Sequence, residues 1–252
     1  MGAVEFERRY TIVRGRRIHS VHCGSGPPVV LVHGLAGSHR WWRYTIPALR
    51  DSYQVHIPEL PGFGRSRRAG PVPSIPEAAE IVLDWMETLG LREAALVGHS
   101  MGGQISIHCA AGQPGRISRL VLAAPAGIPR DLSLRNLPRL ALGLLPPRVW
   151  GRPGFMPTIL MDALRAGPVT LWTALRHILA DDVRGLLPGI SRPTLLIWGD
   201  RDPLVPPEHG PIMRELLADA ELVMIPGAAH NVMVDRPGDF NSVLLDFLEK
   251  GR

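Results

Sequence analysis

The sequence predicts an α/β protein in which a mostly parallel sheet is flanked by helices. Short, continuous apolar runs, such as residues 28–32, 94–97 and 194–198, alternate along the chain with segments of helical pattern. Continuous apolar runs are typical of strands buried on both faces, which occur in parallel sheets covered by helices. The length of 252 residues suits one large domain with an insertion.

The chain begins with a predicted hairpin. Residues 6–13 and 16–22 alternate in the manner of antiparallel strands, and Arg14 and Gly15 lie between them. Alternation indicates strands with one solvated face. We therefore expect the hairpin at an edge of the sheet.

The first buried strand, residues 28–32, is followed by the glycine-rich loop His33–Gly37 and a helical stretch that contains tryptophans. Ligands bind at the carboxyl ends of the strands in open parallel sheets. The loop is therefore placed to supply a backbone N–H, that of Leu35, to a reacting oxyanion. After the next buried strand, residues 53–57, the loop of residues 59–66 is interpreted as scaffold near the site.

A predicted helix begins at Ser74 and ends at Gly90. Ser74 and Glu77 have the spacing of a capping box, and a proline lies in the first turn. An apolar stripe follows at helical spacing, and a glycine at the end favours termination of a helix. Its expected apolar face comprises Ala78, Ile81, Val82, Trp85, Met86 and Leu89.

Residues 94–103 predict a strand, a sharp turn and the start of a helix. Gly98 and Gly102 lie two positions either side of Ser100, where they let the backbone pass close to itself and hold a serine hydroxyl out at the end of the strand. We predict Ser100 as a nucleophile and the Met101 N–H, at the positive end of the helix dipole, as an oxyanion donor. The Gly-x-Ser-x-Gly pattern also occurs in ordinary loops, so its context decides the interpretation.

After a strand at Arg119–Ala123, the pattern changes. Residues 128–187 contain repeated prolines and more apolar side chains than a surface loop exposes. We predict a helical cap (lid) over Ser100 at 128–187, and a core domain formed by residues 1–127 and 188–252. The cap residues expected to cover the core, line a pocket or pack within the cap are Leu132, Leu134, Leu137, Leu140, Leu144, Leu145, Trp150, Phe155, Met156, Leu160, Met161, Leu164 and Trp172.

The strand and helix alternation then resumes, and two strands end in loops that carry Asp202 and His230. Imidazole can take a proton from serine and return it to a leaving group, while a carboxylate orients the imidazole. We therefore predict Ser100, Asp202 and His230 as a catalytic triad. Asp200 is the alternative acid and is expected to cap its turn.

Two neighbours of these residues are expected to be structural. Asp235 is interpreted as a partner of nearby backbone, and His99 as a packing residue beneath the turn.

Four segments together resemble the α/β-hydrolase superfamily over essentially the whole chain: residues 33–37, 98–103, 199–202 and 227–230. The resemblance implies an eight-stranded sheet with a cap between strands six and seven. It also implies acyl transfer without a cofactor, with Ser100, Asp202 and His230 as triad and the N–H groups of Leu35 and Met101 as oxyanion hole. Some relatives place the acid after strand six, but residues 123–130 contain no carboxylate.

The leading functional hypothesis is a carboxylesterase for small to medium apolar acyl groups. Ser100 argues against the dehalogenases and epoxide hydrolases of this fold, which use aspartate at that position. Carbon–carbon hydrolases of ring-cleavage products tend to carry tryptophan after the histidine, where Asn231 stands here. That activity, a cofactorless perhydrolase and a non-catalytic receptor or scaffold on the same fold are the alternatives.

Composition limits the partners. The formal charge is +5, but the 28 basic residues are scattered and only Lys250 is a lysine, which argues against nucleic acid and excludes a Gly-x₄-Gly-Lys phosphate loop. No His-Glu-x-x-His metal motif and no long apolar segment occur, so neither metal catalysis nor a membrane span is predicted. We expect a cytoplasmic monomer or homodimer with two free thiols that acts on a small-molecule ester.

Overall fold

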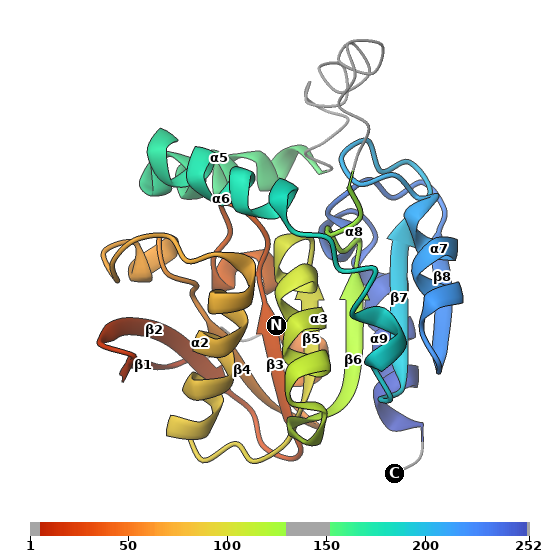
Figure 1. Ribbon diagram of the computed structural model, residues 1–252, viewed down its shortest axis with the longest axis horizontal. Helices are drawn as coiled ribbons and strands as arrows, with labels where there is room; N and C mark the ends of the chain where they lie inside the picture. The colour runs from red at the N-terminus through yellow and green to blue at the C-terminus, as the bar shows by residue number, and fades with distance from the viewer. Residues whose placement is uncertain (1–5, 130–151, 251–252) are drawn as a thin grey trace.

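The computed structural model describes residues 6–129 and 152–250, and it contains one eight-stranded sheet (Figure 1). The strand order is β1-β2-β4-β3-β5-β6-β7-β8. The strands are β1 Glu7–Val13, β2 Arg16–Cys23, β3 Pro28–Val32, β4 Gln54–Pro58, β5 Ala94–His99, β6 Ile117–Ala123, β7 Thr194–Gly199 and β8 Ala220–Ile225. The predicted α/β class, the eight strands and the mostly parallel sheet are thus confirmed.

The hairpin of β1 and β2 forms the edge of the sheet. Arg14 and Gly15, in the turn, both have positive φ, which suits a two-residue hairpin turn. β2 pairs antiparallel with both β1 and β4, and β3 to β8 run parallel. Consequently the loops after β3, β4, β5, β7 and β8 meet at one end of the sheet.

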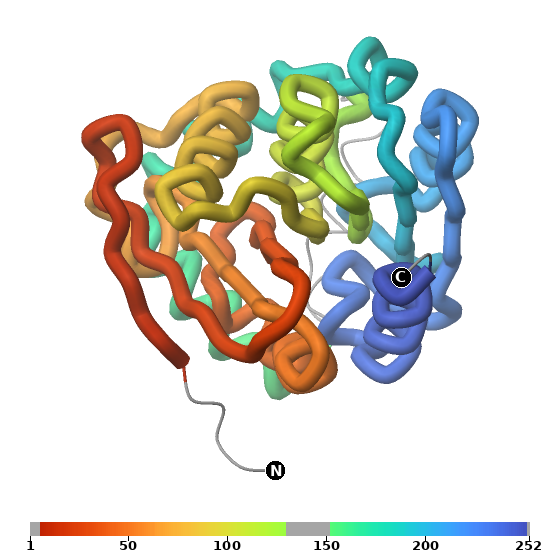
Figure 2. Tube along the Cα trace, turned by 90° about the horizontal axis from the view of Figure 1, so that it is seen from below, coloured from red at the N-terminus to blue at the C-terminus, as the bar shows by residue number. Residues whose placement is uncertain are grey.

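Helices cover both faces of the sheet (Figure 2). One buried cluster packs α2, α3 and α7 against one face, and a second packs α1, α8 and α9 against the other. The α-helices are α1 Ile46–Leu49, α2 Ile75–Thr88, α3 Met101–Gly112, α5 Met156–Ala166, α6 Pro168–Ala180, α7 His209–Leu216, α8 Val232–Asp235 and α9 Pro237–Glu249. The short 3₁₀ helices are η1 His39–Trp42, η2 Gly64–Ser66, η3 Pro114–Arg116, η4 Pro153–Phe155 and η5 Leu187–Gly189.

Helix α2 has the predicted ends. Ser74 and Glu77 form the capping box, and Gly90 follows the helix with φ of +73°. The expected apolar face is buried except for Leu89, which is partly buried. These local signals position α2 against α3 beside the active-site end of the sheet.

Helices α5 and α6 follow β6 in the chain and lie across the end of the sheet where the parallel strands finish (Figure 1). Phe155, just before α5, is fully buried. Leu160, Met161, Leu164 and Trp172 are exposed, so they are not among the cap residues that cover the core. The two helices form a single layer over the core, so only one face of each helix can contact it. The cap residues predicted between 130 and 151 lie outside the described residues.

Candidate active site

Ser100 lies in a strained turn between β5 and α3. Its φ is 54° and its ψ −117°, a conformation that costs a non-glycine residue roughly 1–3 kcal/mol. A side chain at Gly98 would meet the carbonyl oxygen of Gly102, and one at Gly102 would meet that of Val32. The two glycines are therefore required for the close packing that holds the serine at the strand end.

The hydroxyl of Ser100 meets an imidazole from the other end of the chain. Ser100 Oγ lies 3.0 Å from His230 Nε2, and His230 Nδ1 lies 2.8 Å from Asp202 Oδ2. Because the ionised carboxylate only accepts, Nδ1 carries the proton and donates to it, which leaves Nε2 as acceptor for the serine hydroxyl. Asp202 and His230 are both buried.

Asp202 is fixed by the backbone that follows it. The N–H groups of Leu204 and Val205 donate to Asp202 Oδ1 over 2.8 and 2.9 Å. The second carboxylate oxygen is thus left for His230. Asp202 follows β7 and His230 follows β8, and these two strands pair in parallel. The two residues therefore converge although they are far apart in the sequence.

The loop after β3 lies directly against Ser100. A side chain at Gly34 would come within 3.1 Å of Ser100 Cβ and 2.9 Å of His99 Nδ1, so only glycine lets this loop approach. Leu35 follows in the same loop, and Met101 is the first residue of α3, where backbone N–H groups have no partner within the helix. The loop that contains Leu35 thus lies against the serine, and the role of the Leu35 and Met101 N–H groups as oxyanion donors stays a prediction.

The sequence that builds this site matches a known family. A sequence model of the alpha/beta hydrolase family matches residues 29–243. The chain belongs to the alpha/beta hydrolase family. The family resemblance read from the sequence motifs is confirmed.

Similar proteins include both transferases and hydrolases. The chain is 31% identical to the dihydrolipoyllysine-residue acetyltransferase component of an acetoin cleaving system from Pseudomonas putida, over 94% of this chain and 68% of that protein. It is 27% identical to a pimeloyl-[acyl-carrier protein] methyl ester esterase from Nitrosospira multiformis, over 89% of this chain and 95% of that protein. A solved structure of a thermophilic esterase from Thermogutta terrifontis matches with a TM-score of 0.84 and 25% identity, over 97% of this chain and 98% of that one.

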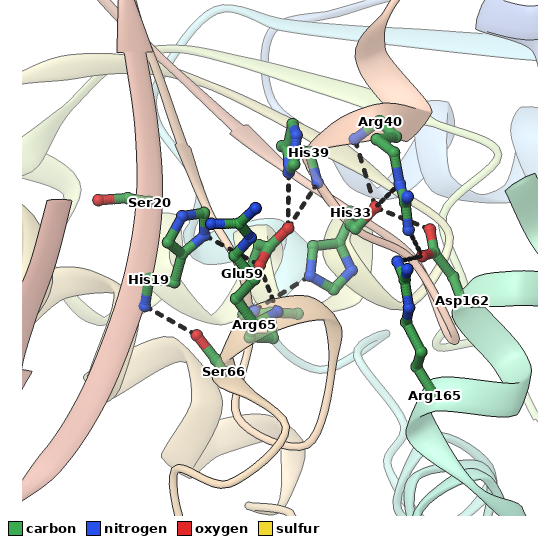
Figure 3. Close-up of polar contacts among 12 residues, drawn as sticks. His19, Ser20, His33, His39, Arg40, Glu59, Arg65, Ser66, Asp162 and Arg165 are labelled. Atoms are coloured by element: carbon green, nitrogen blue, oxygen red, sulfur yellow. Dashed lines mark hydrogen bonds and ion pairs between the residues drawn. The ribbon is translucent and has the colours of Figure 1, made fainter. Parts of the chain in front are cut away.

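In the loop after β4, this α/β hydrolase has a buried carboxylate, Glu59, in a segment that the sequence analysis assigned only to scaffold. Glu59, in the loop after β4, accepts from His19 Nδ1 at 3.0 Å, His39 Nδ1 at 2.6 Å and the Arg65 N–H at 2.6 Å (Figure 3). Burial by itself raises the pKa of Glu59, but these hydrogen bonds outweigh it and hold the pKa well below its ordinary value. The charged Glu59 thereby joins β2, the loop after β3 and the loop after β4.

His33, the first residue of the loop after β3, lies near Glu59 (Figure 3). Its Nε2 accepts from the Leu60 N–H at 3.0 Å, so its Nδ1 carries the proton and donates to the Gly34 carbonyl at 2.9 Å. Burial lowers the pKa of His33, which keeps this neutral tautomer. The imidazole therefore fixes the backbone that leads into Leu35.

A second buried carboxylate comes from α5 (Figure 3). Asp162 accepts from Ser38 Oγ at 2.7 Å and from the Arg40 guanidinium, and the Arg165 guanidinium lies 4.0 Å away. Asp162 is only 1% exposed, and no sequence motif singled it out. Its contacts tie α5 to Ser38 and Arg40, which immediately follow the loop His33–Gly37.

Asp200, Asp235 and His99 make structural contacts, although Asp200 bonds to the loop after β8 and not to its own turn. Asp200 accepts from the Gly227 N–H at 2.6 Å, and Asp235 from the Ala229 N–H at 2.9 Å. His99 is buried beneath the turn, 4.8 Å from the His230 ring between centroids, and its Nε2 donates to the His230 carbonyl. Burial, followed by the nearby His230, lowers the pKa of His99 well below its ordinary value, so it remains neutral.

A narrow apolar cavity adjoins Met101 under α6. Its volume is about 10 Å³, enough for roughly one water molecule. Its walls are Leu60, Pro61, Phe63, Val72, Pro73, Ile75, Ala78, Met101, Ile105, Ala174 and His177. His177 Nδ1 is engaged with the Pro73 carbonyl at 2.9 Å. The lining is thus mainly apolar.

Among residues 6–129 and 152–250, no group of three or more His, Cys, Asp or Glu side chains is arranged to hold a metal ion. No helix in the same part of the chain is both long and apolar enough to span a membrane.

Proposed function

We propose that this chain is a serine carboxylesterase that cleaves esters of small to medium apolar acyl groups. The observation that carries the proposal is the continuous hydrogen-bond chain from Ser100 Oγ through His230 to Asp202. The esterase among the relatives supports the reaction class. The apolar cavity beside Met101 supports an apolar acyl group.

In the proposed mechanism, Ser100 Oγ attacks the ester carbonyl while His230 Nε2 takes the serine proton. The N–H groups of Leu35 and Met101 stabilise the negative charge on the former carbonyl oxygen. His230 then gives its proton to the leaving alkoxide, and the acyl group stays on Ser100. Water, deprotonated by His230, attacks the acyl-enzyme; the bond to Ser100 Oγ breaks, His230 returns the proton to Oγ, and the acid is released. Asp202 stabilises the imidazolium in both halves without taking a proton.

We also propose that α5 and α6 act as a lid within a cap at residues 128–187. The cavity beside Met101 has room for roughly one water, so acyl groups larger than this require α6 to move. Gln104 Nε2 donates to the Ile178 and Asp181 carbonyls, at the end of α6. These few polar contacts, together with Asp162, hold the lid closed.

The test is hydrolysis of p-nitrophenyl acetate and butyrate by the wild type and by Ser100→Ala. Loss of the nucleophile should lower kcat by up to about 10⁶-fold. Ser242→Ala, which changes an exposed serine of α9, is the matched control and should keep full activity. Equal rates in Ser100→Ala and wild type would reject the proposal. Turnover of a ring-cleavage dienone without ester turnover would favour the carbon–carbon hydrolase alternative, and no turnover the non-catalytic scaffold.

A further inference from the structure

The outer face of α5 and α6 is apolar and exposed. It comprises Leu160, Met161 and Leu164 on α5, and Val169, Trp172 and Leu179 on α6. Val169 is 78% exposed, Leu164 68% and Trp172 64%. Within the described residues, ten large apolar side chains are exposed, and these two helices carry six of them. Such a concentration on a water-facing surface indicates an interaction site.

The inner face of the same helices is already packed against the core. Ile159, Leu171 and Ile178 pack against the core, and the buried Asp162 bonds to Ser38 and Arg40. The helices are therefore apolar on both faces, a pattern that belongs to helices covered on both sides. Among residues 6–129 and 152–250, contacts cover only the inner side.

The exposed charges within α5 and α6 are of one sign, and the nearest carboxylates in the sequence, Asp181 and Asp182, follow the end of α6. Asp162 is the only carboxylate residue in α5 and α6, and it is buried. Arg165 and Arg176 are exposed, and Arg176 lies seven positions after Val169, within the apolar stripe of α6. An anion thus meets attraction here and no opposing carboxylate from the two helices.

A basic groove borders the lid on the side of η2, which contacts α5. Its volume is about 330 Å³, and it is lined by Tyr10, Arg17, Arg65, Arg67, Arg68 and Ala69. In the part of the chain that the structure describes, none of these four arginines forms an ion pair with a carboxylate. The groove is therefore a second concentration of positive charge, and its Arg65 lies in η2, the 3₁₀ helix that contacts α5.

We propose that the outer face of α5 and α6, with the adjacent arginine groove, binds an anionic lipid–water interface. An apolar face on convex helices with arginine at its border suits the boundary between acyl chains and headgroups. Trp172 is of the residue type enriched at that boundary. A lipid surface needs no matching shape, whereas an acidic protein would need a complementary one. The face points away from the core at the end of the sheet that carries Ser100.

The test is co-sedimentation with phosphatidylcholine vesicles that contain about one third phosphatidylglycerol, and with vesicles of phosphatidylcholine alone. The full chain carrying Ser100→Ala is used so that no lipid is hydrolysed. The double variant Leu164→Gln, Trp172→Gln should bind at least roughly tenfold more weakly to both kinds of vesicle. The double variant Arg67→Gln, Arg68→Gln should lose roughly tenfold only on the anionic vesicles, and salt should weaken that binding.

The matched control is Ile212→Gln, Met224→Gln, which changes exposed apolar side chains outside the lid and should bind like the parent. Circular dichroism verifies that every variant is folded. Absence of vesicle binding, or an equal loss in the control, would overturn the proposal. So would a dimer in sedimentation that Leu164→Gln, Trp172→Gln dissociates while vesicles stay unbound. Because the assay uses Ser100→Ala, its result is independent of the proposed esterase activity.

Discussion

The substitution Asp162→Asn tests whether α5 is anchored through one buried carboxylate. Asn keeps the shape, but its amide presents an N–H₂ group to one of the two donors, Ser38 or Arg40. A hydrogen bond to a charged group contributes about 1.5–3 kcal/mol, and breaking a buried pair costs about 3–5 kcal/mol. The Arg40 side chain is 37% exposed, so water compensates part of the loss. We expect the free energy of unfolding to fall by about 2–3 kcal/mol.

The measurement is urea unfolding, combined with hydrogen exchange at the amides of the loop from His33 to Ser38. Exchange there should accelerate, because this loop loses its tie to α5. Asp182→Asn is the control, since the Asp182–Arg184 pair is exposed and contributes less than about 1 kcal/mol. Equal stability of Asp162→Asn and wild type, or an equal loss in the control, would refute the anchoring role.

Three further perturbations follow from buried contacts. Gly102→Ala places a methyl group against the carbonyl oxygens of Val32 and residue 33, so a thermal scan should show a loss of about 3 kcal/mol or no folded protein. His22 and His56, 2.8 Å apart between Nδ1 atoms, have pKa values lowered to about 4, mainly by burial. The native pair therefore stays neutral while the unfolded chain binds protons below 6.5, and stability should fall by up to about 3 kcal/mol per histidine as the pH drops from 6.5 to 4. In urea unfolding across this range, the free energy of unfolding of His56→Asn should depend less steeply on pH than that of the wild type; an equal dependence would contradict the role of His56. Glu59→Gln removes a charge that three donors share and should cost about 2–3 kcal/mol in urea unfolding; a cost below about 0.5 kcal/mol would show that the charge is unimportant.

The sheet could be predicted because its signals are local. The apolar runs that became β3, β5 and β7 are continuous, and the capping box at Ser74 marks the start of α2 within the chain. The convergence of Ser100, Asp202 and His230 could be anticipated from the same strand pattern, since parallel strands bring their following loops to one edge.

The hydrogen bonds of Glu59 and Asp162 and the orientation of α5 and α6 could not be anticipated. Glu59 meets His19 across 40 positions, and Asp162 meets Ser38 across 124, so neither pair leaves a short motif. A carboxylate directly after a buried strand, as at Glu59, was the one available signal. For α5 and α6, apolar residues occur on both faces, and periodicity alone does not say which face is covered.

The most direct test of the central claim is labelling with a serine-directed fluorophosphonate, followed by mass spectrometry of the intact protein and its peptides. If Ser100, His230 and Asp202 form a working relay, one adduct forms and maps to Ser100. His230→Ala should then slow labelling by several orders of magnitude. An unlabelled Ser100, or labelling that is as fast without the imidazole, would contradict the account.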